Sequence, residues 1–222
     1  MLAVQHRFTH NFTLLANETW SHCFTESEVA LNGATYGQDP FNRHGEYANC
    51  FADHRHAFNF TSVVRTPKFS TRWTGRILGN WQESTIFTAA TGTYSSIAVG
   101  TDNSRTGGGA DRPNVVGDPN LSNPALNHWF DTSAFVVAAV GAFGNVGRST
   151  ILGPGAWNVD VALSRSFSLT ERRRIDFRGE AFNLMNHARF GNPNTTMNSP
   201  SYGQILTARD PRIMQFALKY VF

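Results

Sequence analysis

Apolar and polar residues alternate along the last stretch of the chain, 212–222, with the period of two that is typical of a β-strand. The opposite face of this strand is small or polar, apart from Val221. A soluble edge strand with an aromatic face would invite aggregation, whereas a strand between lipid and a watery lumen requires one apolar face. The alternative is the last strand of a soluble β-sandwich. The apolar face carries Met214, Phe216, Leu218, Tyr220 and Phe222.

The same alternation predicts six further strands, which lie at about 2–9, 12–22, 54–65, 81–92, 157–167 and 172–183. In the strand 172–183, apolar or small residues face one way, and Asp176, Arg178 and Glu180 face the other. We predict that these charges face a wet barrel lumen, where opposite signs pair across strands. A pair of acid/base carboxylates is the alternative reading of Asp176 and Glu180. The facing of 81–92 is ambiguous, because Glu83 shares a face with aromatic residues.

The connections between these strands alternate between short ones (10–11, 66–79, 168–171) and long ones (23–53, 93–155, 184–211). Short turns at one end and long, irregular loops at the other are typical of an outer-membrane barrel. Bacterial single-chain barrels have an even number of strands, and an open edge in lipid is costly, so seven strands predict part of a larger barrel. Aromatic residues near the strand ends predict interfacial girdles: Phe8, Trp20, Trp81, Trp157, Phe167, Tyr220 and Phe222.

Composition agrees with this interpretation. Only 16% of the 222 residues are charged, below the quarter or so that is usual for soluble domains. The net charge of +3 is small and dispersed, so no nucleic-acid partner is predicted. The longest apolar run, 135–143, falls short of the roughly 18 residues that a membrane helix needs. Residues 1–8 do not resemble a secretory signal, which also favours a piece of a larger protein.

The two cysteines, Cys23 and Cys50, lie in the same long loop. A location outside the cytoplasm favours a disulfide that ties this loop, and two unpaired thiols are the alternative.

Histidines and glycines give only weak signs of a chemical site. His54 and His56 share one face of a strand and could hold a metal with His22 or His44. A polar strand end at the edge of the membrane explains them better. The glycines at 107–109 lack the Lys and Ser/Thr of a phosphate-binding loop. We therefore predict no metal, no cofactor and no catalytic residue.

Several motifs near the C-terminus carry a family resemblance. They are GPG at 153–155, WNVDVALSRSF at 157–167, LTER at 169–172, FRGEAFN at 177–183, NH at 186–187, FGNP at 190–193, SPSYGQI at 199–205 and ARDPRIMQFALKYVF at 208–222. Earlier segments that fit are FTLLAN at 12–17, TWSHC at 19–23, DHRH at 53–56 and DRPN at 111–114. Together they resemble the C-terminal barrel strands of TonB-dependent receptors, in particular the Oar-like group with an N-terminal carboxypeptidase-regulatory-like domain. Glu18 and the apolar run 135–143 depart from the pattern.

The resemblance implies that residues 1–222 are the C-terminal portion of an all-β, antiparallel transmembrane barrel of about 22 strands, without the plug domain and N-terminal strands. It implies import of an unidentified extracellular ligand across the bacterial outer membrane, energised by the TonB complex through the missing N-terminal region. Lipid and the barrel-assembly machinery are further partners. Phe216, Leu218, Tyr220 and Phe222 match the C-terminal signal that this machinery reads. The role is recognition rather than catalysis.

Two alternatives remain from the sequence. One is an adhesive or structural outer-membrane barrel, which binds ligands through its loops and transports nothing. The other is a soluble, carbohydrate-binding β-sandwich.

Overall fold

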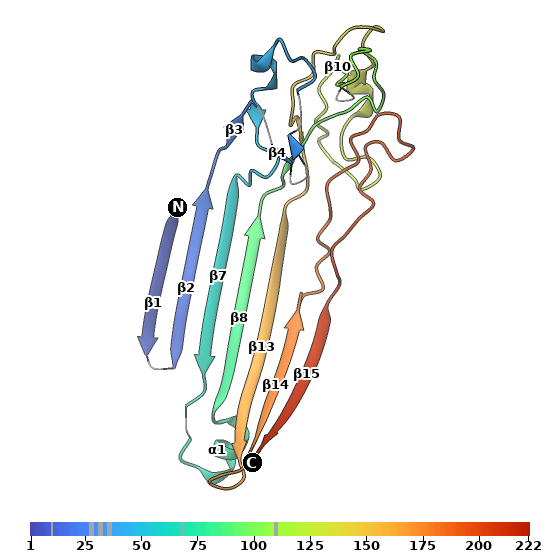
Figure 1. The fold of residues 1–222 in the computed structure, drawn as a ribbon. Coiled ribbons are helices and arrows are strands. Elements are labelled where there is room, and N and C mark those ends of the chain that lie inside the picture. Colours follow the sequence, from blue (N-terminus) through green and yellow to red (C-terminus); the bar gives the residue numbers. More distant parts are fainter. Residues whose placement is uncertain (10, 27–28, 31–32, 35–36, 68, 109–110) are drawn as a thin grey trace.

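The main feature of the computed structural model is one antiparallel sheet of seven strands in the order β1-β2-β7-β8-β13-β14-β15 (Figure 1). The structure describes residues 1–222 except 10, 27–28, 31–32, 35–36, 68 and 109–110, and it leaves out the side chains of 6–9, 29–30, 33–34 and 72. The strands are β1 (Leu2–Thr9), β2 (Phe12–Trp20), β7 (His56–Arg65), β8 (Trp81–Ala90), β13 (Ala156–Ser168), β14 (Arg174–Phe182) and β15 (Ile213–Val221). All seven predicted strands are therefore present.

The observed strand ends differ from the predicted ones by two residues at most. The largest differences are at the predicted starts 54 and 172 and at the predicted ends 22 and 92, where the strands are shorter. At 172 the physical reason is a turn: the backbone N–H groups of Leu169 and Thr170 both donate to the carbonyl of Arg173. The ladder between β13 and β14 therefore begins only with the pair Ser168 and Arg174.

The register divides the sheet into two faces, because directly paired residues in antiparallel strands point to the same side. One row of paired residues across β2, β7, β8 and β13 is Asn17, Asn59, Thr88 and Asn158. The next row is Ala16, Phe60, Phe87 and Val159. We call the side of the first row the polar face and the side of the second row the apolar face. The facing of β8, which was ambiguous from sequence, is now defined, with Trp81, Glu83 and Phe87 on the apolar face.

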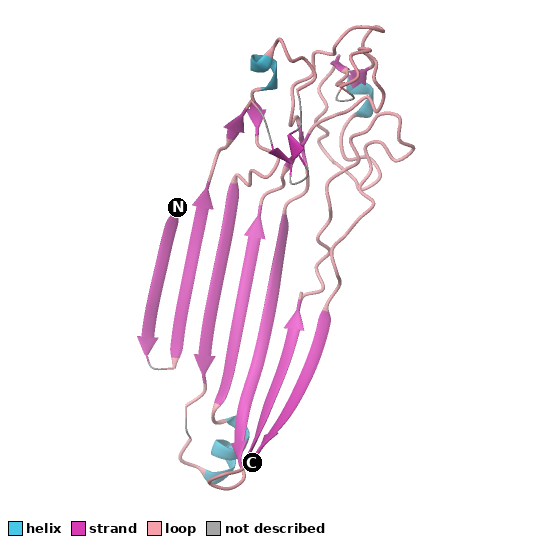
Figure 2. Cartoon of the chain, in the orientation of Figure 1, coloured by secondary structure: helices cyan, strands magenta, loops and turns pink. Residues whose placement is uncertain are grey.

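The long connections all leave the sheet at one end, and the short connections join the strands at the other (Figure 2). The connection 66–79 contains a short helix, α1 (Arg72–Leu78), which the pattern of apolar and polar residues does not predict. The long loops contain short elements rather than purely irregular chain. These are β3 (Phe24–Thr25), β4 (Val29–Ala30), β5 (Gly33–Ala34), η1 (Arg43–Glu46), β6 (Ala48–Asn49), β9 (Tyr94–Ser95), β10 (Asn114–Val115), η2 (Thr132–Ala134), β11 (Phe135–Val136) and β12 (Ile151–Leu152).

No helix in the described part of the chain is both long enough and apolar enough to cross a membrane.

Residues 93–155, expected to be irregular, fold around a hydrophobic core of their own. Ile97, Phe130, Phe135, Val146 and Ile151 are all buried in it. The rings of Phe130 and Phe135 meet edge to face, with 6.1 Å between centroids. This core explains why the run 135–143 is more apolar than a solvated loop would be, since its first residue is part of the core.

The arrangement excludes the β-sandwich alternative for the described residues. Besides the seven-stranded sheet, these residues form only sheets of two strands each. A sandwich needs two sheets of comparable size packed face to face. The single two-faced sheet instead fits the wall of an antiparallel barrel that these strands do not close by themselves.

Removing a ring from the loop core should open the loops and leave the sheet intact. Phe130→Ala deletes a side chain that is 3% exposed, and such a change costs about 3–5 kcal/mol. We expect faster protease cleavage within 93–155, measured by mass spectrometry of the released peptides. Val140→Ala is the matched control, because Val140 is 68% exposed and its truncation should change stability by less than about 0.5 kcal/mol. Equal cleavage of both variants would contradict a packed loop core.

Candidate functional site

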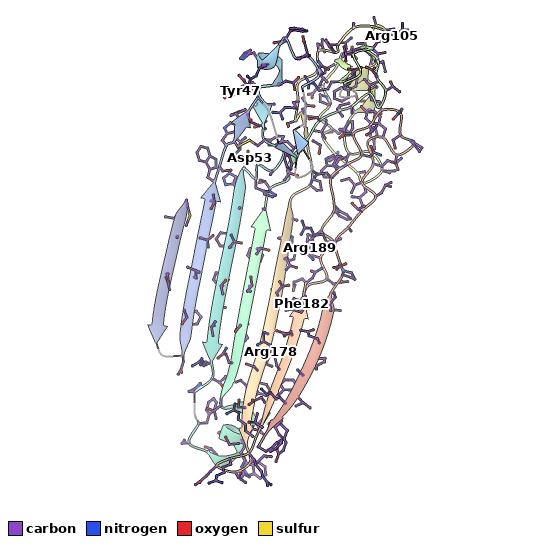
Figure 3. All side chains as sticks on the ribbon, in the orientation of Figure 1. Tyr47, Asp53, Arg105, Arg178, Phe182 and Arg189 are labelled. Carbon is purple, nitrogen blue, oxygen red and sulfur yellow. A yellow bond between two sulfur atoms is a disulfide. The ribbon has the colours of Figure 1, made fainter. Side chains whose placement is uncertain are left out.

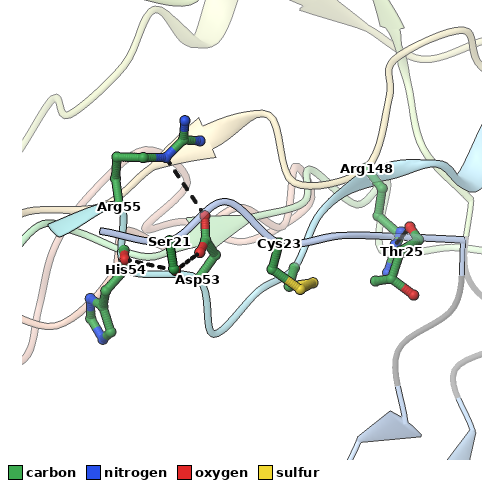
Figure 4. Close-up of a disulfide and its surroundings, with 8 residues drawn as sticks. Ser21, Cys23, Thr25, Asp53, His54, Arg55 and Arg148 are labelled. Carbon is green, nitrogen blue, oxygen red and sulfur yellow. Dashed lines mark hydrogen bonds and ion pairs between the residues drawn. A yellow bond between two sulfur atoms is a disulfide. The ribbon is translucent and has the colours of Figure 1, made fainter. Parts of the chain in front are cut away.

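The loop end of the sheet is tied together by a disulfide between Cys23 and Cys50, whose Cα atoms are 5.4 Å apart (Figure 4). The backbone N–H of Cys50 also donates to the carbonyl of Cys23 at 3.0 Å, directly beside the β3–β6 pair. Close by, the Ser21 hydroxyl donates to the buried carboxylate of Asp53 at 2.6 Å, and Arg55 lies 3.9 Å from the same carboxylate. The first long loop is thus fixed to the ends of β2 and β7, and the disulfide has the partners considered from sequence.

A buried ion pair joins the first long loop to the second. Both terminal nitrogens of Arg112 donate to the carboxylate of Glu46, at 2.8 and 2.9 Å. The side chain of Gln38 continues the contact by accepting from the backbone N–H of Arg112, and Arg148 donates to the carbonyl of Glu46. A bidentate Arg–carboxylate pair defines both distance and orientation. It therefore fixes how the two loops sit against each other.

Two ionisable groups in the loops have perturbed pKa values with clear causes. Burial raises the pKa of Tyr202 to about 12, so its phenol stays protonated. The pKa of Asp131 is lowered, first by the hydrogen bond from the Ser133 hydroxyl and then by that from the Ser133 backbone. Both groups have structural roles, because Tyr202 packs on the loop core and Asp131 caps η2.

The three predicted lumen charges, Asp176, Arg178 and Glu180, lie together on the polar face of β14. Arg178 pairs with Glu180 on its own strand, which differs from the prediction that opposite charges pair across strands. The cross-strand hydrogen bonds come from neutral side chains: Ser166 donates to Asp176 at 2.6 Å, and Gln215 donates to Glu180. Every charge in the row thus has a polar partner at the surface of the sheet.

The C-terminal strand β15 forms an edge of the sheet and presents its aromatic residues on the apolar face. Phe216 lies opposite Gly179, and its ring is so close that a Cβ on this glycine would stand 3.1 Å from it. The side chains of Phe216 and Leu218 are 70% and 75% exposed. Together with Tyr220 and Phe222, these two side chains form an exposed apolar row along the edge strand.

The aromatic residues expected near the strand ends are at those ends. Trp81, Phe167, Tyr220 and Phe222 lie toward the short turns, and Trp20 and Trp157 lie toward the long loops. The side chain of Phe8 falls outside the described residues.

Three ionisable residues on the apolar face each have a polar partner. Glu18, which departs from the family pattern, accepts a hydrogen bond from the His56 ring at 2.9 Å. Glu83 accepts one from the Thr85 hydroxyl. Arg165 donates to the carbonyl of Ile77 at the end of α1, and its guanidinium lies 4.5 Å from the ring centre of Phe167. The role of Arg165 was missed, because it depends on a helix that the sequence did not reveal.

The histidines considered as metal ligands have other partners. His54 contacts the carbonyl of Thr91 at 2.6 Å, and His56 contacts Glu18. His22 and His44 instead belong to a row of aromatic rings around Phe24 and Tyr47. Across the described residues, no three His, Cys, Asp or Glu side chains gather as a metal site would require.

A cavity of about 400 Å³ lies where the ends of β7, β8 and β13 meet the last long loop. Asn59 and Thr88 line it from the polar face, and residues 189–192 with Arg209 line it from the loop. His54 and Trp157 also border the cavity, and the Trp157 ring lies on the apolar face beside Phe87. Figure 3 shows Arg189 beside the loop ends of β13 and β14. No local pattern in the sequence indicates this site, because its residues come from five separate segments.

A family model described as "Outer membrane beta barrel domain" matches residues 1–215. Comparisons with curated proteins and with solved structures gave no match.

Neutralising Glu46 should loosen the first two long loops. Glu46→Gln leaves the guanidinium of Arg112, which is 7% exposed, without its counter-charge, and breaking a buried pair in this way costs about 3–5 kcal/mol. We expect faster hydrogen exchange at the backbone amides of Gln38 and Arg112. Arg43→Gln is the control, since the pair of Arg43 and Glu26 is exposed and contributes about 0–1 kcal/mol. Unchanged exchange in Glu46→Gln would show that the pair does not hold the loops.

Proposed function

The chain belongs to the outer membrane β-barrel domain family, and we propose that it forms part of the wall of an outer-membrane receptor that imports an extracellular ligand. Its location is the bacterial outer membrane. In this proposal TonB energises the import, as the resemblance of the C-terminal motifs to TonB-dependent receptors implies. The chain contributes wall strands, long outer loops and the C-terminal assembly signal.

The observation that carries the import proposal is the polar face of the sheet. One of its rows holds Asn59, Thr88 and Asn158. Rows nearer the short turns hold Arg178 and the charged residues around it, each with a polar partner. A lipid-facing surface would exclude such residues, whereas the lumen of a transport barrel is polar. The described parts of the long loops lie at the end of the sheet where that lumen would open, and they are suited to meet a ligand first.

The open edges of the sheet support a larger barrel. Within the described strands, β1 and β15 each have a neighbour on one side only. In lipid, every backbone N–H and C=O group left unpaired costs several kcal/mol, so both edges require further strands. We propose that residues 1–222 are the C-terminal part of such a barrel, and that its plug contacts TonB.

The edge strand β15 supports the proposed contact with the barrel-assembly machinery. Phe216, Leu218, Tyr220 and Phe222 are on its apolar face, and its outer edge is unpaired. An unpaired strand edge is a template for adding another strand. We propose that the machinery holds this edge until the barrel closes.

A second candidate function is adhesion without transport. The packed core of the second long loop favours it, because a stable outer surface is what a binding barrel needs. An adhesive barrel would have the same wall and loops. Uptake is the property that separates the two functions.

A charge on the apolar face should impair membrane assembly, whereas the same charge on the polar face should not. Val159→Arg places the charge on the apolar face opposite Phe87, in the row that also holds Phe60 and Ala16, where it costs about 2–4 kcal/mol in lipid. Ala162→Arg is the matched control, because Ala162 lies beside Glu180 on the polar face. We expect less folded chain in outer-membrane fractions for Val159→Arg, measured by heat-dependent gel mobility. Similar loss in both variants would contradict the assignment of the two faces.

Import is tested by what cells remove from their medium. We expect that deletion of the gene, and separately of TonB, leaves the same compounds behind, measured by mass spectrometry of the spent medium. Restoring the gene should restore their removal. If the gene-deleted strain removes the same compounds as the parent, import is wrong and adhesion is favoured.

A further inference from the structure

We propose that the cavity at the loop end of β7, β8 and β13 binds a small, hydroxylated organic anion. This inference rests on the proposed receptor role, for which it names the class of ligand. The basic residues of the site are His54, Arg189 and Arg209.

The charges around the cavity are of one sign. Its lining includes both arginines but no Asp or Glu. Among the described residues, neither Arg189 nor Arg209 forms an ion pair with a carboxylate. Guanidinium groups recognise carboxylate and phosphate through paired, directional hydrogen bonds. The cavity therefore has the charge of an anion site that is not already neutralised by the protein.

Arg189 supplies the second observation. Its Nε atom is buried and has no hydrogen-bond partner. Buried polar groups in proteins are nearly always hydrogen-bonded, and each exception needs an explanation. Solvent does not reach this Nε, so an anion oxygen contacts the terminal nitrogens of the guanidinium instead. Arg189 as a whole is only partly buried and lines the cavity, so the site contains a partly desolvated guanidinium without a counter-charge among the described residues.

Neighbouring hydrogen bonds fix the wall of the cavity. A carbonyl can only accept, so the ring Nδ1–H of His54 donates to Thr91, and the orientation of the ring is set. Asn192 donates to the Thr93 hydroxyl at 2.9 Å, while its own oxygen occupies the space beside Gly153. A rigid wall lowers the entropy cost of binding.

The size and the remaining groups define the rest of the ligand. A cavity of about 400 Å³ is in the range of sites for small molecules. Asn59 and Thr88 offer hydrogen bonds to hydroxyl groups from the polar face. These residues suit a sugar-sized body. Because Asn59 and Thr88 belong to the polar face, the ligand is a soluble anion rather than a lipid headgroup.

The test is equilibrium binding to outer-membrane vesicles from cells that produce the full chain. The probes are radiolabelled glucuronate and glucose 6-phosphate, with glucose as the neutral probe of similar shape. We expect saturable binding of at least one of the anions, and affinity for glucose lower by about tenfold or more, because hydrogen bonds to charged groups are the stronger ones. Vesicles from cells without the gene give the background. Absence of saturable binding of both anions, or equal affinity for glucose, would overturn the proposal.

Variants assign the binding to the cavity. Arg189→Gln and Arg209→Gln should each weaken anion binding by about tenfold or more, whereas Arg189→Lys should retain part of it. Arg105→Gln is the control, because it removes the same charge from an exposed loop position far from Arg189 (Figure 3). Heat-dependent gel mobility and the intact disulfide of Cys23 and Cys50 check that each variant is folded. Unchanged binding in a folded double variant, Arg189→Gln with Arg209→Gln, would place the anion elsewhere.

This test is independent of import. An adhesive barrel that transports nothing would still bind the anion in vesicles. Conversely, a transporter whose ligand is neutral would pass the uptake test and fail this one.

Discussion

The pairing of backbone hydrogen bonds is the constraint on which the rest of this structure depends. In hydrocarbon no water is present to replace a missing partner, so a chain that crosses with strands must pair each strand with its neighbours. From β1 to β15 each described strand pairs antiparallel with its neighbours, and the ladder of β1 and β2 has a register irregularity between Arg7 and Thr9. The strands β7, β8 and β15 have 10, 10 and 9 residues, close to the roughly 9–11 that a tilted strand needs to cross. Because side chains alternate along each strand, the same hydrogen-bonded sheet has one polar face and one apolar face.

The apolar face shows how ionisable residues are accommodated under this constraint. Glu18 and Arg165 lie toward opposite ends of the sheet, Glu18 near the long loops and Arg165 near the short turns. Each has a polar partner, His56 for the first and the carbonyl groups of α1 for the second. Long side chains near a membrane boundary reach polar surroundings at a small cost, whereas a charge in mid-bilayer does not. The helix α1 also provides polar partners, because its last turn supplies acceptors to Arg165 and to the Trp81 indole.

The strands could be predicted from sequence, and the assembly of the loops could not. A period of two over eight or more residues identifies a strand locally, and this was enough for β1 to β15 of the large sheet. The loops depend on contacts between distant residues, such as Glu46 with Arg112, which no local pattern reveals. The helix α1 is short, carries Gly75, and is held by residues of β8 and β13 rather than by its own propensity. The cavity combines residues from five separate segments, so no local pattern predicts it either.

The position of Arg189 follows from hydrogen bonds that begin in the sheet. The carboxylate of Asp160, on β13, accepts from the backbone N–H of Asn183, where β14 has just ended. Asn183 is 2% exposed, has a φ of 51°, and exchanges hydrogen bonds with the backbone of His187 through both ends of its amide. Asparagine tolerates this left-handed conformation better than most residues. The turn directs the chain past Trp157 to Arg189, so the barrel wall, rather than a mobile loop, sets where this guanidinium lies.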